Sequence, residues 1–330
     1  MRICVVGCGA LGGICAAHLA QLPDVETFAY DVDAAHVEAI NERGLRLTGV
    51  GELRARLAAA TEPDELPPCR FGIVATKALH TGAAIAATAH LFRGGSVCTV
   101  QNGIGNEHVL ADHVERVIAG TAFPGGTVRE PGVIGWDTAG QTTIGPFGPA
   151  PAPMSEVEAL AAVLSRSGMP TRAVADVRGA QWTKIVFNAA ANSVGALTGL
   201  PHGRVCDDSA LRALVSGLVA EGSAVARTLG VELDGDPEAL VELGHRVAYE
   251  HRSSMLQDVV ARRPTEVDVL NEAIARLGRQ AGVPTPLNDA VAALVKGVER
   301  SWGPGRDSSP PPARSEARRG QDCGRRTPTA

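Results

Sequence analysis

The chain has 330 residues, which is enough for about two domains of ordinary size. Hydrophobic residues make up 45% of the sequence and charged residues 20%, so the bulk of the chain is not low-complexity disorder. The formal net charge of -5 argues against a nucleic-acid-binding surface, which normally has a basic balance, and we expect no nucleic-acid partner.

The first part of the chain alternates short apolar runs with helical segments. The apolar run at 2–6 leads into a glycine-rich turn and then into an alanine- and leucine-rich helix at 14–22. Asp33 is placed to cap a second helix, which ends at Gly44. This alternation predicts a doubly wound parallel sheet, the Rossmann type of α/β fold. Further strands are expected at 25–30, 70–75, 96–100 and 117–121.

The pattern changes twice further along the chain. Between 125 and 148, Gly, Pro and Thr punctuate short apolar runs, and we expect antiparallel hairpins that close the first domain. From residue 176 onward, helical periodicity predicts an all-α second domain. Its helices are expected near 176–197, 208–229, 236–249, 265–281 and 286–300.

These elements divide the chain into three parts. Residues 1–174 form the predicted dinucleotide-binding domain, and residues 175–302 form the predicted helical domain for substrate binding and homodimer formation. Residues 303–330 contain six Arg, three acidic residues and almost no large apolar side chains, a composition that predicts a disordered tail.

Cysteine usage and apolar runs indicate the compartment. The seven Cys residues are odd in number and include no C-x-x-C pair, so we expect reduced thiols, a cytoplasmic location and no metal site. No run of 18 apolar residues occurs, and we therefore expect no transmembrane helix and no membrane partner.

A glycine motif stands where the first strand meets the first helix. The first Gly of such a motif permits a tight turn, the second lets the backbone approach a pyrophosphate, and the third lets helix and strand pack closely. Free N–H groups at the helix N-terminus then attract the phosphates, so the motif predicts dinucleotide binding. The alternative is a glycine-rich turn with no ligand. The motif comprises Gly7, Cys8, Gly9, Ala10, Leu11 and Gly12.

Polar residues follow three of the predicted strands. Asp31 ends the second strand, where an acid typically hydrogen-bonds a ribose 2′-hydroxyl. Asp31 could instead be a turn residue or cap, with Arg54 reaching a 2′-phosphate. Lys77 and Asn102 follow two other strands, and ligands of open α/β sheets bind beyond the carboxyl ends of the strands. Both are therefore predicted cofactor contacts, the alternatives being an ordinary surface Lys and a turn Asn.

Three polar residues form a stripe on the first helix of the second domain. Lys184, Asn188 and Asn192 are spaced four residues apart and share one helix face. Their neighbours are apolar on all sides, which predicts a mostly buried helix whose polar groups need partners. The stripe is either a solvated edge or a strip facing a ligand, and its strict register favours the ligand.

A second polar segment follows much later in the chain. Thr265 and Asp268 form a capping-box pattern, which places Glu266 in the first turn of a helix. Glu266 then stabilises the helix dipole, pairs with Lys184 or holds a substrate hydroxyl. Ser253 and Ser254 are either helix caps or groups that bind a substrate carboxylate.

Taken in order, these motifs resemble the ketopantoate reductases (2-dehydropantoate 2-reductases) over about residues 1–302. The resemblance implies a Rossmann domain followed by a helical domain, with the active site between them. It also implies hydride transfer from a reduced nicotinamide, NADH or NADPH, to a 2-keto acid. The matching segments are the glycine motif, Thr76-Lys77-Ala78, Gln101 to Gly105, Trp182 to Lys184 with Asn188 and Asn192, Ser253 to Asp258, and Thr265 to Asp268.

The resemblance also implies roles for individual residues. Lys184 would be the general acid and Glu266 its carboxylate partner. The substrate pocket would be lined by Asn102, Asn188, Asn192 and Ser254, and Lys77 would lie beside the cofactor. Hydride attack on a ketone develops negative charge on oxygen, which a buried ammonium stabilises and can protonate.

Two residues depart from the family pattern. Members that use NADPH usually have a basic residue at the end of the second strand, and Asp31 stands there in this chain, which favours NADH. Many members have Pro after the second stripe asparagine, where this chain has Ser193. The expected reaction is the reduction of ketopantoate to pantoate in pantothenate biosynthesis. The alternatives are a 2-hydroxyacid dehydrogenase of the same fold for another branched or aromatic 2-keto acid, and a non-enzymatic nucleotide sensor.

Overall fold

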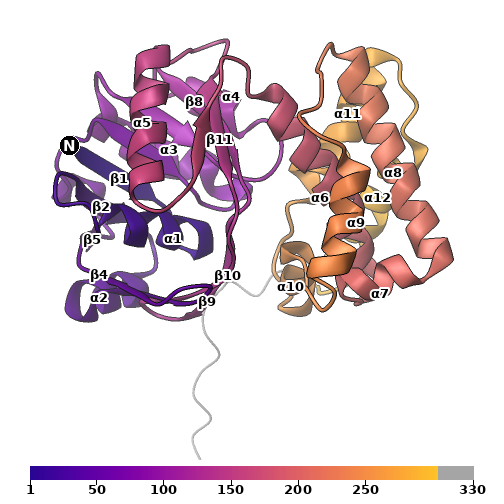
Figure 1. The fold of residues 1–330 in the computed structure, drawn as a ribbon, viewed down its shortest axis with the longest axis horizontal. Helices are drawn as coiled ribbons and strands as arrows, with labels where there is room; N and C mark the ends of the chain where they lie inside the picture. Colours follow the sequence, from indigo (N-terminus) through magenta and orange to yellow (C-terminus); the bar gives the residue numbers. More distant parts are fainter. Residues whose placement is uncertain (304–330) are drawn as a thin grey trace, which may run out of the picture.

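A computed structural model describes residues 1–303 of the chain, so the predicted tail lies almost wholly outside the described residues. Within residues 1–303, all strands lie in the first part of the chain, and from Arg178 to Gly303 the regular elements are helical. The two parts stand side by side, with α6 (Arg178–Thr198) at the junction (Figure 1). The expected class, a mostly parallel α/β sheet followed by a helical domain, is confirmed.

The main sheet has eight strands in the order β12-β11-β8-β7-β6-β1-β2-β5, and every pair is parallel except β11 with β8. The neighbouring strands β1 and β6 lead to chain segments on opposite sides of the sheet, so their carboxyl ends form the crevice where ligands of such sheets bind. The strands are β1 (Arg2–Val6), β2 (Glu26–Tyr30), β5 (Ala58–Ala60), β6 (Phe71–Val74), β7 (Ser96–Thr99), β8 (Val117–Ala122), β11 (Thr142–Pro146) and β12 (Thr171–Ala173).

Helices cover both faces of this sheet, which explains the continuous apolar runs of its central strands (Figure 1). Asp33 caps α2 by accepting a hydrogen bond from the His36 N–H, and Gly44 ends it at φ +80°, both as predicted. The helices of this part are α1 (Ala10–Leu19), α2 (Ala34–Arg43), α3 (Thr81–Thr88), α4 (Asn106–Ala111) and α5 (Met154–Arg166).

A second, four-stranded sheet packs on α1. Its order is β4-β3-β10-β9, formed by β3 (Leu45–Gly49), β4 (Leu53–Ala55), β9 (Gly125–Glu130) and β10 (Val133–Thr138). The β9–β10 hairpin is the antiparallel hairpin expected after residue 125. The pairing of β10 with β3 joins segments far apart in sequence, and neither β3 nor β4 was predicted.

The second part packs its helices around one apolar core. The expected helix at 265–281 was wrong at its start: residues 267–269 form a single 3₁₀ turn and the α-helix begins at Asn271. Thr265 therefore caps no α-helix. Two short helices lay outside the expected set, α7 (His202–Asp207) and α10 (Ser254–Val260), although a helix cap at Ser253 was one interpretation of that segment. The helices are α6 (Arg178–Thr198), α7 (His202–Asp207), α8 (Ser209–Thr228), α9 (Pro237–Val247), α10 (Ser254–Val260), α11 (Asn271–Ala281) and α12 (Pro286–Arg300).

One helix within residues 1–303, α8, is long and apolar enough to cross a membrane by length and composition alone. Core helices of soluble proteins meet the same test, and α8 contributes Val215, Leu218 and Val225 to the core of the helical part.

Candidate active site

The glycine motif adopts the geometry that its three glycines predict. Gly7 has φ +87°, and a Cβ there would lie 2.5 Å from Thr76 Cγ2. A Cβ on Gly12 would lie 1.8 Å from the Gly7 carbonyl oxygen, so helix and strand are in close contact. A Cβ on Gly9 would meet nothing within 4 Å. The surface above Gly9 is therefore open for a ligand.

The same loop fits a dinucleotide phosphate. Gly9 is the N-cap of α1 and provides no side-chain cap, so the first N–H groups of this helix stay available to an anion. The Cys8 thiol faces the protein interior, where burial raises its pKa, with the nearby Asp31 carboxylate a smaller cause. The thiol is therefore protonated and unreactive at neutral pH.

Asp31 binds the glycine loop directly. Its Oδ2 accepts a hydrogen bond of 2.7 Å from the Cys8 N–H, and its Oδ1 accepts one of 3.0 Å from the Asp33 N–H. Arg54 packs against Gly44, which ends α2, and within residues 1–303 its side chain makes no hydrogen bond or ion pair to Asp31 or to the glycine loop. Asp31 is thus a charged side chain in direct contact with the loop.

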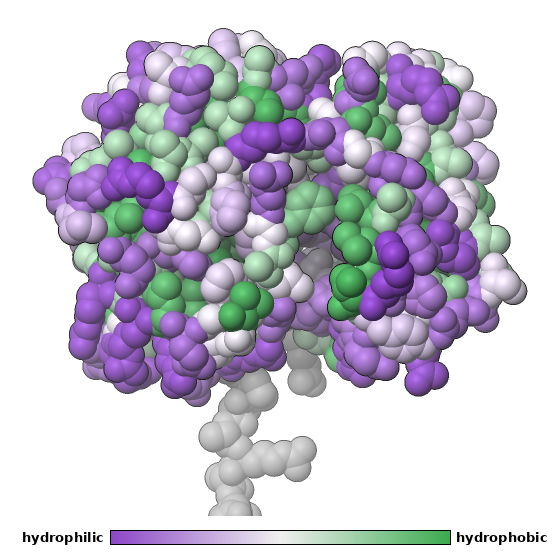
Figure 2. Space-filling view, viewed as in Figure 1, coloured by the Kyte–Doolittle hydropathy of each residue, from purple (hydrophilic) through white to green (hydrophobic). Residues whose placement is uncertain are grey.

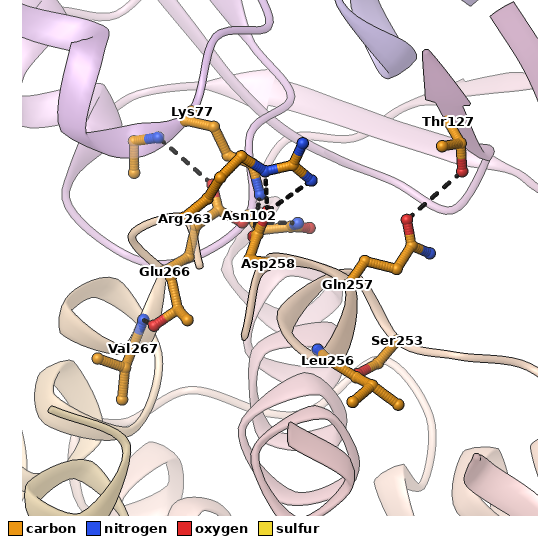
Figure 3. Close-up of polar contacts among 12 residues, drawn as sticks. Lys77, Asn102, Thr127, Ser253, Leu256, Gln257, Asp258, Arg263, Glu266 and Val267 are labelled. Carbon is orange, nitrogen blue, oxygen red and sulfur yellow. Dashed lines mark hydrogen bonds and ion pairs between the residues drawn. The ribbon is translucent and has the colours of Figure 1, made fainter. Parts of the chain in front are cut away.

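A hydrogen-bond network fixes the strand ends that face the second domain. Gln101 donates from Nε2 to the Thr76 carbonyl at 2.8 Å and to Thr81 Oγ1 at 2.8 Å. Asn106 then donates from Nδ2 to the Asn102 carbonyl at 2.9 Å. Asn102 is therefore held at the edge of the sheet, with its side chain directed toward the helical part (Figure 3).

Lys77 bridges the two parts of the chain. Its Nζ lies 2.6 Å from Oδ2 of Asp258, which is only 3% exposed, and Arg263 binds the other carboxylate oxygen at 3.2 Å (Figure 3). Lys77 was expected beside the cofactor, and in this structure its ammonium group is engaged by the helical domain. Asp258 stood in a matching segment of the sequence, but no role was predicted for it.

Glu266 also crosses between the two parts. One carboxylate oxygen accepts from the Ala78 N–H at 3.3 Å and the other from Asn102 Nδ2 at 3.1 Å (Figure 3). Glu266 is buried, and it precedes the 3₁₀ turn rather than lying in the first turn of an α-helix. The reason is that its carboxylate binds backbone and amide donors of the other domain, so it does not serve a helix N-terminus.

Lys184 lies on the face of α6 that looks toward the sheet. Its Nζ donates to the Ala122 carbonyl and lies 5.4 Å from the centre of the Phe123 ring. Burial lowers the pKa of Lys184 to about 8, and the negative charge of Glu266 opposes that shift. Among the described residues the two groups form no direct ion pair. Asn102 donates to Glu266 and accepts a hydrogen bond of 3.5 Å from Asn188 Nδ2, which lies one helical turn from Lys184 on α6.

A small pocket lies between the two domains at these residues. Lys184, Asn188 and Asn102 line it, so three of the predicted site residues converge. Sequence reasoning assigned no role to Gln101, Thr121 or Gln181. The full lining is Gln101, Asn102, Gly103, Gly120, Thr121, Gln181, Lys184, Ile185 and Asn188.

Asn192 and Ser254 lie outside this lining. The Asn192 carbonyl accepts a hydrogen bond of 3.4 Å from Ser253 Oγ, which also caps α10 by accepting from the Leu256 N–H. Ser254 is exposed, and its side chain forms no hydrogen bond within residues 1–303. Ser253 therefore joins α10 to α6, while Ser254 is free to face a ligand.

The outer face shows a hollow between the two domains, with apolar side chains gathered over α9 on the helical side (Figure 2). Leu243 and Val247 of α9 are 45% and 73% exposed. The hollow therefore has an apolar wall on its helical side.

Comparison with known proteins agrees with this geometry. Two family models match the chain: ketopantoate reductase PanE/ApbA over residues 3–149 and its C-terminal domain over residues 176–299. The 2-dehydropantoate 2-reductase of Pyrococcus horikoshii is 31% identical over 304 residues, covering 92% of this chain and 99% of the relative. That of Halobacterium salinarum is 32% identical over 307 residues, covering 91% and 99%.

Solved structures are similar over the same length. A PanE/ApbA family ketopantoate reductase from Ralstonia eutropha is 28% identical with a TM-score of 0.82, covering 91% of this chain and 99% of that one. A D-mandelate dehydrogenase with NADH and anilino(oxo)acetate is 26% identical with a TM-score of 0.84, at the same coverage. The chain belongs to the ketopantoate reductase family, whose members are NAD(P)-dependent oxidoreductases that act on CH–OH groups.

Proposed function

We propose that this protein reduces 2-dehydropantoate to pantoate, a step of pantothenate biosynthesis, and that Lys184 is the general acid. The observation that carries the proposal is the Lys184 ammonium in an interdomain pocket, with a pKa lowered to about 8 and with Asn102 and Asn188 beside it. The names of curated relatives at about 31% identity support the substrate.

The proposed chemistry divides between cofactor and protein. A bound reduced nicotinamide would supply the hydride to the keto carbon, and Lys184 supplies the proton to the carbonyl oxygen. A lysine with a pKa near 8 is mostly protonated at pH 7 and still donates readily. Its contact with the Ala122 carbonyl orients the ammonium before the proton moves, and the resulting amine regains a proton from water.

Glu266 has two roles in the proposed mechanism. Its charge opposes the effect of burial on Lys184 and keeps the lysine protonated. Its carboxylate is fixed by Ala78 and Asn102, where it can accept a hydrogen bond from a substrate hydroxyl. Asn188 and Asn192 present amides from α6, and Ser254 presents a hydroxyl from α10 for the substrate carboxylate.

Asp31 supports NADH as the preferred cofactor. Its carboxylate lies at the glycine loop, where it would accept a hydrogen bond from a ribose 2′-hydroxyl and repel a 2′-phosphate. We further propose a cytoplasmic homodimer with no nucleic-acid or membrane partner, supported by the cysteine usage, the lack of an 18-residue apolar run and the net charge of -5.

A second candidate is the reduction of an aromatic 2-keto acid. Phe123 is 38% exposed although its ring lies beside the Lys184 ammonium, so an aromatic face is available next to the proton donor. The likeness to D-mandelate dehydrogenase supports the same alternative.

Steady-state turnover separates these candidates. The measurement is kcat/KM for 2-dehydropantoate and for phenylglyoxylate, each with NADH and NADPH. We expect 2-dehydropantoate with NADH to give the highest value. Turnover of phenylglyoxylate alone would replace the proposed substrate, and turnover of neither would refute both candidates.

A further inference from the structure

A buried histidine of α2 contacts the glycine loop. His36, near the start of α2, is 3% exposed, and its side chain makes two hydrogen bonds to backbone groups. Its Nε2 lies 2.9 Å from the Cys8 carbonyl oxygen, and its Nδ1 accepts a hydrogen bond of 3.1 Å from the Gly132 N–H. The ring thus joins the glycine loop to the turn between β9 and β10.

The two partners determine the tautomer of the ring. The Gly132 N–H can only donate, so Nδ1 of His36 carries no proton. A neutral imidazole then has its proton on Nε2, which donates to the Cys8 carbonyl. A cationic ring would direct an N–H at the Gly132 N–H, so this arrangement requires the neutral form.

The orientation of the Cys8 carbonyl determines where the next N–H points. A trans peptide is planar, and its C=O and N–H point in opposite directions. Because His36 draws the Cys8 carbonyl into the protein, the Gly9 N–H points outward. Among residues 1–303 no hydrogen bond uses the Gly9 N–H, and the space above Gly9 is open.

Asp31 fixes the orientation of the preceding peptide, the one between Gly7 and Cys8. It binds the Cys8 N–H, and the Gly7 carbonyl on the opposite side of that peptide lies against Gly12. Two successive peptides of the loop are therefore oriented by side chains of the β2–α2 segment, one through its N–H and one through its carbonyl.

We propose that His36 is a positioning residue for the nicotinamide cofactor, which turns the Gly9 N–H toward the cofactor phosphates. His36 contacts no ligand itself and acts through the Cys8–Gly9 peptide. The inference depends on the family's cofactor and not on the choice of 2-keto acid.

Three substitutions at one position test this role. His36→Gln can still donate to the Cys8 carbonyl, His36→Asn can reach only toward Gly132, and His36→Leu can do neither. The readout is the Kd of NADH and of NADPH without any keto acid. We expect His36→Leu and His36→Asn to raise the Kd at least about 10-fold, equivalent to roughly 1.4 kcal/mol. We expect His36→Gln to stay within about 3-fold of the wild type.

The matched control is His18, another buried histidine, at the opposite end of α1. Its Nδ1 lies 2.8 Å from the Ser167 carbonyl, and its substitution by Leu should lower the melting temperature while leaving nicotinamide affinity unchanged. Equal losses of affinity in both Leu variants would reduce His36 to a packing residue and overturn the proposal. A wild-type nicotinamide affinity in His36→Asn together with a weakened affinity in His36→Gln would also overturn the proposal.

A spectroscopic measurement tests the tautomer independently. In the ¹⁵N spectrum of the labelled protein, His36 should show a protonated Nε2 and an unprotonated Nδ1 at neutral pH. A proton on Nδ1 would contradict the contact with Gly132 and the proposal with it. Because binding is measured without a keto acid, failure to reduce 2-dehydropantoate would refute the proposed function and leave this test unaffected.

Discussion

The glycine loop and the interdomain pocket are built in opposite ways. In the loop, Cys8 is bound by Asp31, only 23 residues away, and Gly12 packs on the Gly7 carbonyl of the same motif, while Gly7 also contacts Thr76. In the pocket, Glu266 binds Ala78 across 188 residues and Lys77 binds Asp258 across 181. A short motif can therefore specify the cofactor loop, whereas the chemistry of the pocket depends on how two domains meet.

Removing the proton donor tests the pocket most severely. Lys184→Ala should lower kcat by roughly 10²–10⁴ because the developing oxyanion loses its proton source, while nicotinamide affinity stays nearly unchanged. The matched control is Lys296→Ala, a lysine of the same domain that pairs with Asp268 and does not line the pocket. Near-normal kcat in Lys184→Ala would remove this residue from the mechanism.

Two alanine substitutions in the glycine loop should have separate effects. Gly12→Ala places a Cβ against the Gly7 carbonyl and should cost about 3 kcal/mol, which lowers the melting temperature by roughly 6–12 °C. Gly9→Ala has space for its methyl group, so stability should hold while nicotinamide affinity falls. Thermal denaturation and fluorescence titration measure the two effects. Unchanged affinity in Gly9→Ala would show that the cofactor does not approach there.

Cofactor choice tests the charge beside the loop. Repulsion between Asp31 and a 2′-phosphate should favour NADH by about 1–3 kcal/mol, or roughly 5- to 150-fold in kcat/KM. Asp31→Asn keeps an acceptor for the Cys8 N–H but removes the charge, so it should reduce the ratio of kcat/KM for NADH to that for NADPH. Asp31→Arg should reverse this preference. A wild-type preference for NADPH would mean that Asp31 does not contact the ribose.

The smallest expected effect is on the pH dependence of the rate of keto-acid reduction. The Lys184 pKa of about 8 predicts that the rate of keto-acid reduction is constant below pH 7 and falls through pH 8 as the ammonium loses its proton. Glu266→Gln removes the charge that raises this pKa, so the fall should move to lower pH. A profile that keeps its midpoint in Glu266→Gln would separate Glu266 from the titration of Lys184.

The predictions from sequence succeeded where the determinants are local. The cap at Asp33 and the strand-turn-helix at Gly7 depend on neighbours in the chain, and both form as expected. Lys184 and Asn188 share one face of α6 because of the helix register, whereas Asn102 joins them from the other domain, a meeting that only the family resemblance implied. The predicted start of α11 was wrong because Glu266 binds Ala78 and Asn102 of the other domain instead of a helix N-terminus. No periodicity within the segment reveals these distant partners.

Half of the small sheet, β3 with β4, was not predicted, and the way this half joins the predicted β9–β10 hairpin also depends on a distant segment. β3 and β4 are short strands that pair with each other, and β3 gains its second partner only when β10, more than 80 residues later, pairs beside it. The roles of Asp258 and Gln101 depend likewise on partners from other segments, Lys77 for one and Thr76 with Thr81 for the other.

The ion pair between Lys77 and Asp258 limits how freely the two halves of the molecule can be exchanged. A chimaera that joins this α/β half to the helical half of another reductase would inherit only one member of the pair. If the other half lacked the matching charge, a carboxylate or an ammonium would stay at the junction without its counter-ion. The two halves are therefore not interchangeable modules, and a recombined enzyme would need positions 77 and 258 chosen together.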